Sequence, residues 1–141
     1  RIMRIRVMSL VVLLVVGFGG LTGCRTEGGF KPINTAKYDY ENHEPFVLMD
    51  RSVQRSVTVA GIQETVKEDG RLEVVANVRN RVNRRIQVQI SCVFKNANGF
   101  STGDETPWNT LILTEAEQQS VSFTSANPKA QKYTIRVRQA R

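Results

Sequence analysis

The sequence predicts an all-β fold: an immunoglobulin-like antiparallel β-sandwich of about seven strands that follows an N-terminal lipoprotein signal peptide. Two observations predict the sandwich. Short runs in which apolar and polar residues alternate recur from residue 57 to residue 138. Turn-forming clusters separate these runs roughly every 8–12 residues, a spacing typical of sandwiches. A small β-barrel is the alternative, and no amphipathic stretch is long enough to predict a substantial helix.

The first 23 residues have the layout of a secretory signal peptide. Three arginines among the first six residues precede an apolar run over 7–16, and glycines follow it. The run is shorter than the about 20 residues that a membrane-spanning helix needs, so a transmembrane anchor is the less favoured alternative. The segment ends in a motif that resembles the lipobox of bacterial lipoproteins: Leu21, Thr22, Gly23 and Cys24. In that class the cysteine is lipidated and the chain is cut just before it.

The remaining chain divides into a tether over 24–45 and one domain over 46–141. The tether is rich in glycine, asparagine and charge and has no periodic apolar pattern. The whole sequence has a formal charge of +7, from 20 basic and 13 acidic residues. Three of the arginines lie in the signal and no acid does, so residues 24–141 carry a charge of +4. This mild excess suits an anionic envelope surface better than nucleic acid, which we exclude as a partner.

The first half of the domain predicts three strands. Residues 45–49 are short enough for an edge strand that begins at a proline. The run over 57–62 leads to a turn cluster at 67–70, in which Gly70 can adopt a positive φ. Residues 72–78 then alternate at period two, as a half-buried strand does. A polar connection over 80–85 follows.

The second half predicts the remaining strands. Residues 86–94 place four apolar side chains and the Cys92 thiol on one face, and 96–99 have strong turn chemistry. We interpret 101–106 as a polar loop, 108–113 as a returning strand, and 121–125 and 133–137 as the last strands. Because Cys24 would carry lipid, Cys92 has no disulfide partner, and its apolar neighbours predict a buried structural thiol.

These residues resemble the YcfL-like family of bacterial lipoproteins over roughly 48–138. The most telling part runs from Asn80 through the strand at 86–94 to Asn98-Gly99-Phe100 and Pro107-Trp108. A second part joins 122–128 to the strand at 133–138. The resemblance implies a single periplasmic immunoglobulin-like domain at the outer membrane. It implies no enzymatic activity.

The residues themselves give little sign of catalytic chemistry. His43, the single histidine, lies in the predicted tether, where no fixed acid could orient it. Asp104 and Glu105 are adjacent and would point apart, so we interpret them as solvated loop charges. We therefore predict no enzyme, no metal site and no cofactor.

One aromatic residue and several arginines are the candidates for a binding surface. Trp108 is the single tryptophan and begins a predicted strand, which favours its partial or full burial. The arginines could contact an anionic polymer or lipid, or could simply be solvated. The predicted surface comprises Trp108, Asn109, Arg84, Arg85, Arg136 and Arg138.

Together these features predict a lipid-anchored, non-enzymatic lipoprotein of the cell envelope. Lipid on Cys24 would hold it in a membrane, and the domain would bind an envelope protein as an accessory module. Arg25 after the cysteine is not an aspartate, and the lipoprotein resemblance then implies the periplasmic face of the outer membrane. The alternative function is a peptidoglycan- or carbohydrate-binding module that uses Trp108 and Asn109.

Overall fold

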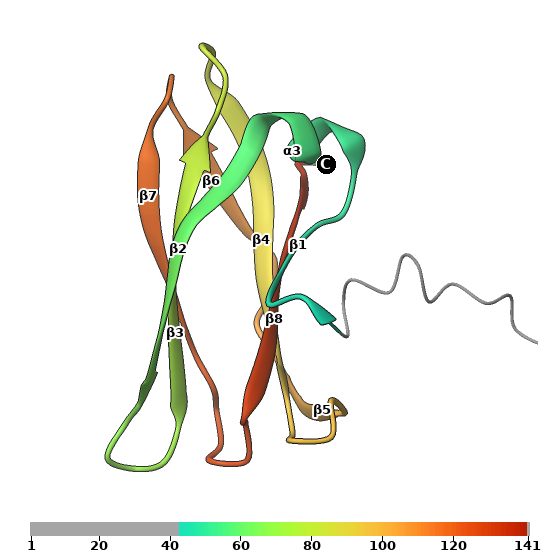
Figure 1. Ribbon diagram of the computed structural model, residues 1–141, viewed down its shortest axis with the longest axis vertical. Coiled ribbons are helices and arrows are strands. Elements are labelled where there is room, and N and C mark those ends of the chain that lie inside the picture. Colours follow the sequence, from blue (N-terminus) through green and yellow to red (C-terminus); the bar gives the residue numbers. More distant parts are fainter. Residues whose placement is uncertain (1–42, 141) are drawn as a thin grey trace, which may run out of the picture. The chain divides into compact units, whose positions relative to one another are not determined.

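The computed structural model describes residues 43–140. The predicted signal peptide, its lipobox residues Leu21, Thr22, Gly23 and Cys24, and the tether up to residue 42 lie outside the described residues, as does Arg141. The described residues form eight strands and the short helix α3 (Figure 1). The elements are β1 (Phe46–Leu48), α3 (Arg51–Ser56), β2 (Val57–Val66), β3 (Leu72–Asn80), β4 (Ile86–Lys95), β5 (Ser101–Glu105), β6 (Asn109–Leu113), β7 (Gln118–Thr124) and β8 (Lys132–Gln139).

The strands form two sheets, which confirms the predicted all-β sandwich. One sheet has the order β2-β3-β7. In the other, β8 lies between β1 and β4, while β5 and β6 both pair with the opposite side of β4. All pairings are antiparallel except that of β1 with β8, which is parallel. β1 is a short strand at the side of its sheet, as the sequence predicts.

The core lies between the sheets and follows the predicted alternation. Residues 72, 74, 76 and 78 of β3 are buried, and the residues between them are partly exposed. Cys92 is among the fully buried side chains of β4, so the prediction of a buried thiol is confirmed. Burial in this apolar layer raises the pKa of the Cys92 thiol to about 12.

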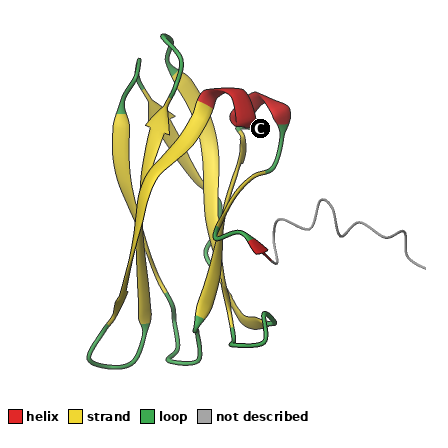
Figure 2. Ribbon diagram, viewed as in Figure 1, coloured by secondary structure: helices red, strands yellow, loops and turns green. Residues whose placement is uncertain are grey.

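The helix α3 is an element that the sequence patterns did not predict (Figure 2). Asp50 caps it, because its side chain accepts a hydrogen bond of 3.0 Å from the backbone N–H of Val53. Val53, with 1 % of its surface exposed, packs into the core. The helix has six residues, too few for an apolar periodicity to be visible. Among the described residues, no helix has the length and apolar composition needed to span a bilayer.

The interpretation of 101–106 as a loop is wrong, because 101–105 form the strand β5. This strand pairs with the end of β4, where Lys95 lies opposite Ser101 and Val93 opposite Glu105. Beyond it, the Thr106 N–H donates to the Cys92 carbonyl at 2.9 Å, and the Thr106 hydroxyl accepts from the Cys92 N–H at 2.8 Å. Backbone pairing therefore holds this segment, while its side chains are polar and at most half-buried.

Candidate functional site

Trp108 and two arginines of β8 lie together on the outward face of the larger sheet. The guanidinium carbon of Arg138 is 3.9 Å from the centre of the Trp108 ring, and that of Arg136 is 5.1 Å from it. Alternate residues of a strand face the same side, which places both arginines on this face. We call these three residues the Trp108 cluster. Their contacts are cation–π interactions, and Trp108 is half-buried, as predicted.

Neighbouring strands hold the two arginines of the Trp108 cluster in place. Arg138 Nε donates a hydrogen bond of 2.9 Å to Gln89 of β4. Arg136 donates to the Ser91 hydroxyl at 3.1 Å and also binds the carboxylate of Glu105 on β5. The cluster is therefore fixed across β8, β4 and the start of β6, and the charge of Arg136, whose side chain is 15 % exposed, is paired with Glu105. The ring face toward Arg138 is already covered by a guanidinium.

The structure does not bring the other predicted binding residues to this cluster. Asn109 follows Trp108 on β6 and pairs with Ile90, a core residue, so its side chain points to the opposite side of the sheet. Arg84 and Arg85 precede β4. Four residues of strand separate Arg85 from Gln89, the partner of Arg138, or about 13 Å. The predicted surface is therefore divided in two: Arg136 and Arg138 lie at Trp108, whereas Arg84 and Arg85 lie before the start of β4.

A buried asparagine shapes the connection that carries Arg84 and Arg85. Asn80, the last residue of β3, has no exposed surface. Its side-chain amide donates to the carbonyl of Arg84 and to that of Thr114, each at 2.7 Å, and its side-chain oxygen accepts from the Val82 N–H at 3.0 Å. In addition, the Arg81 N–H donates to the Ser56 carbonyl of α3 at 2.8 Å. The connection is therefore tied to β3, to the turn before β7 and to α3.

Arg84 and Arg85 line a hollow of about 200 Å³ between this connection and α3. Ser52, on the helix, and Gln87, on β4, are among its other lining residues. We call it the arginine hollow. The sequence did not indicate the contribution of α3, although aspartate, which caps it at position 50, is a residue type favoured at helix N-caps.

The remaining titratable candidates have structural partners or lie exposed. Asp104 and Glu105 lie on β5 and not in a loop, but they point to different partners, as predicted: the backbone N–H of Ala126 donates to Asp104, and the half-exposed Glu105 pairs with Arg136. His43 is exposed at the rim of a hollow of about 360 Å³ that Tyr133 also lines. Among residues 43–140, no group of three or more histidine, cysteine, aspartate or glutamate side chains could hold a metal ion.

Tyr133 connects the two sheets through its phenol. The Tyr133 hydroxyl donates a hydrogen bond of 2.8 Å to Glu64 of β2. Burial, and then this contact with Glu64, raise the pKa of Tyr133 above its ordinary value. The phenol is therefore neutral at physiological pH and serves as a hydrogen-bond donor.

Comparisons with known proteins agree with this fold. A family model described as "Protein of unknown function (DUF1425)" matches residues 46–139. The crystal structure of cj0090 from Campylobacter jejuni is similar, with a TM-score of 0.54 and 15% identity over 68% of this chain and 98% of that one. The crystal structure of a DUF1425 family member from Shewanella sp. pv-4 has a TM-score of 0.55 and 23% identity over 60% of this chain and 79% of that one. At these identities the likeness shows the fold alone. The comparison with curated proteins gives no match.

Proposed function

The chain belongs to the DUF1425 family of proteins of unknown function, and we propose that it works as a lipid-anchored, non-enzymatic binding module of the cell envelope. We place it among YcfL-like lipoproteins, on the periplasmic face of the outer membrane. The observation that carries this proposal is the motif Leu21-Thr22-Gly23-Cys24 behind a short apolar run. Lipid on Cys24 would fix the domain to the membrane through the tether over 24–45.

The chemistry of the described side chains supports a binding role. The Cys92 thiol is buried and protonated, which is the opposite of what a nucleophile needs. The phenol of Tyr133 is likewise protonated and donates to Glu64. Cys92 and Tyr133 therefore stabilise the packing of the sandwich and do not act as nucleophiles.

The Trp108 cluster supports a protein partner for the domain. Its two arginines are held by hydrogen bonds, so they would lose little conformational freedom on binding. Tryptophan and arginine are also the residues that most often dominate protein interfaces. The alternative, a peptidoglycan or carbohydrate ligand stacked on Trp108, has less room, because Arg138 covers one face of the ring.

Substitution of Cys24 tests the anchor. We expect Cys24→Ala to leave an uncleaved precursor that is lost from the outer-membrane fraction. Cys92→Ala is the matched control, since it removes the other cysteine and should leave both the mass and the fractionation unchanged. A Cys24→Ala protein that still reached the outer membrane at its mature mass would refute the lipoprotein assignment.

Photo-crosslinking in the native organism tests the binding role. Thr110 is exposed and pairs with Gln89, so a crosslinking amino acid there lies beside the Trp108 cluster. Glu68 is exposed in the turn between β2 and β3 and serves as the control position. We expect an adduct with an envelope protein from position 110 alone. Adducts with glycan strands would favour the alternative, and identical patterns from both positions would contradict the proposed surface.

A further inference from the structure

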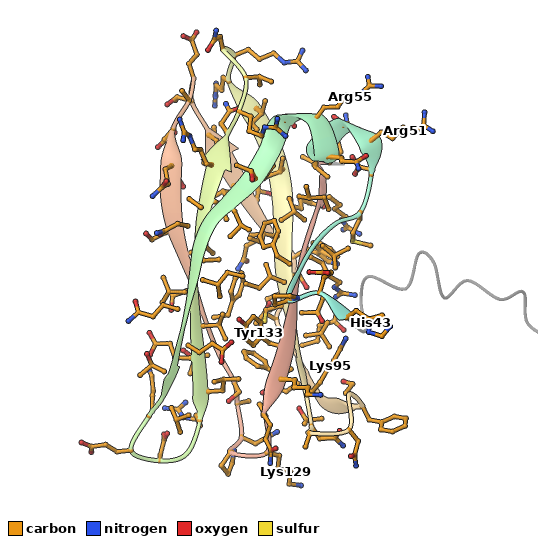
Figure 3. The ribbon with its side chains drawn as sticks, in the orientation of Figure 1. His43, Arg51, Arg55, Lys95, Lys129 and Tyr133 are labelled. Atoms are coloured by element: carbon orange, nitrogen blue, oxygen red, sulfur yellow. The ribbon has the colours of Figure 1, made fainter. Side chains whose placement is uncertain are left out.

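Six exposed arginines lie at one end of the domain. Arg51 and Arg55 come from α3 (Figure 3), and the others come from the end of β3 and the connection that follows it. Within residues 43–140, none of the six side chains makes an ion pair or a hydrogen bond. The six are Arg51, Arg55, Arg79, Arg81, Arg84 and Arg85.

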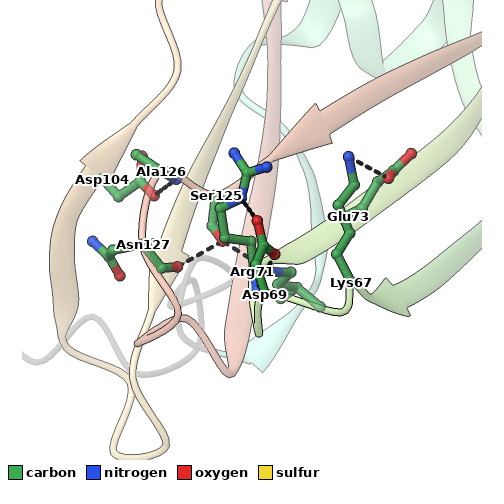
Figure 4. A network of polar contacts seen from close by, with 9 residues as sticks. Lys67, Asp69, Arg71, Glu73, Asp104, Ser125, Ala126 and Asn127 are labelled. Atoms are coloured by element: carbon green, nitrogen blue, oxygen red, sulfur yellow. Dashed lines mark hydrogen bonds and ion pairs between the residues drawn. The ribbon is translucent and has the colours of Figure 1, made fainter.

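Basic residues near the turn between β2 and β3 behave differently. There Lys67 pairs with Glu73 at 3.1 Å and Arg71 with Asp69 at 2.5 Å (Figure 4). Crowding like charges without counter-charges disfavours the compact state. The arginine-rich end therefore carries a cost that a bound anion would offset.

The arginine hollow has the chemistry of an anion site. Each guanidinium offers five N–H donors, and the Ser52 hydroxyl and Gln87 amide can add more. No carboxylate is among the described residues that line it. Asp50 lies at the start of α3, but its two oxygens accept the backbone N–H groups of Val53 and Gln139. The Asp50 carboxylate is thus already engaged by backbone donors.

The backbone under the hollow is fixed before any ligand arrives. Asn80 holds the Arg84 carbonyl, and the Arg81 N–H is bound to the Ser56 carbonyl of α3, so these hydrogen bonds fix the distance between the two walls of the hollow. A ligand would have to order only the arginine side chains, which lowers the cost of binding.

We propose that the arginine hollow binds a phosphate group. Two guanidiniums, with Ser52 and Gln87, offer more hydrogen-bond donors than a carboxylate can accept, because a carboxylate has two oxygens with about four acceptor positions. A phosphate presents three or more acceptor oxygens and matches the guanidinium fork in bidentate geometry. The phosphate could be a soluble ion or ester, or a lipid headgroup. The inference does not depend on lipid at Cys24 and goes beyond the proposed anchoring role.

Amide NMR of the full chain in a non-ionic detergent tests this site. The protein is titrated with inorganic phosphate at constant ionic strength, and separately with dihexanoyl phosphatidylglycerol below its micelle concentration. We expect saturable shifts of the amides over 81–85 and of Ser52. Binding of both probes would identify a general phosphate site, and binding of the lipid alone would identify the headgroup as the source. No saturable shift with either probe would overturn the proposal.

A pair of charge-matched variants separates the site from general attraction. We expect Arg84→Gln with Arg85→Gln to weaken binding at least about tenfold, since each charge-assisted hydrogen bond contributes substantially. Lys129→Gln with Lys132→Gln removes the same charge near the start of β8, at the far end of β4 from the hollow, and should change binding less than about twofold. Equal weakening by both variants, or tighter binding of acetate than of phosphate, would overturn the proposal.

Discussion

Replacement of Asn80 by alanine should remove the hydrogen bonds that shape the arginine-bearing connection. Its side chain satisfies the carbonyls of Arg84 and Thr114 at 2.7 Å and the N–H of Val82 at 3.0 Å. Each of these partners is partly buried, and each lost bond costs about 1 kcal/mol. We therefore expect Asn80→Ala to lower the free energy of unfolding by about 3 kcal/mol. For a domain of this size that loss corresponds to about 12–24 °C in Tm.

Urea unfolding followed by circular dichroism measures this change. Asn77→Ala is the matched control on the same strand, because the exposed contact of Asn77 with the Ser120 hydroxyl should contribute less than about 1 kcal/mol. The slope of the unfolding free energy against urea should stay the same for both variants. A loss below about 1 kcal/mol for Asn80→Ala would refute the view that this amide organises the connection.

Three further predictions concern a turn, the Trp108 cluster and the buried thiol. Gly70 has a φ of +84°, and a Cβ there would lie 3.1 Å from the side chain of Pro128. Gly70→Ala should therefore lower the free energy of unfolding in urea by about 1–2 kcal/mol. Gly61→Ala is the control and should lower it less, because a Cβ there meets nothing within 4 Å. Arg138→Gln should lower stability by about 0.5–1 kcal/mol and change the fluorescence of Trp108, the single tryptophan; an unchanged spectrum would contradict the cation–π contact. Folding raises the pKa of the Cys92 thiol from 9.0 to about 12. As pH rises from 9 toward 12, the thiol therefore loses its proton in the unfolded state before it does so in the folded state. The free energy of unfolding should then fall by up to about 1.4 kcal/mol per pH unit. Cys92→Ala should show a shallower dependence on pH, and equal slopes would contradict this explanation.

The strands that build the core were predictable from sequence because burial itself determines their pattern. In β3, buried apolar residues alternate with partly exposed ones, as the sequence indicates. In β4 the predicted inward face is buried except for the partly exposed Ile86, but Ser91, Val93 and Lys95 on the other face are buried as well, which the sequence pattern did not indicate. By contrast, β5 carries polar side chains and exists because its backbone pairs with β4. The helix α3 depends on a cap at Asp50 and on one buried valine. Neither the backbone pairing of β5 nor the cap and single buried valine of α3 produces a periodic pattern of apolar residues in the sequence.

The candidate site was predictable only in part for a related reason. Alternation along β8 places Arg136 and Arg138 on one face, and alternation along β6 points Asn109 away from Trp108. The contact between Trp108 and the arginines depends on β4 lying between β6 and β8, which is a long-range pairing. The joining of α3 to the β3–β4 connection depends in the same way on contacts between distant segments.

The construction of β2 has a consequence for the behaviour of many copies held close together. β2 is ten residues long and pairs with β3 on one side only, so its other side could in principle accept a strand from a second molecule. Its register with β3 shifts between Val59 and Gly61, which bends the strand. Glu64 pairs with the core residue Val74 and so places a carboxylate on the inward side, where Tyr133 binds it. A neighbouring copy would have to match the bend and bury that charge, which protects the domain from edge-to-edge aggregation at high local density.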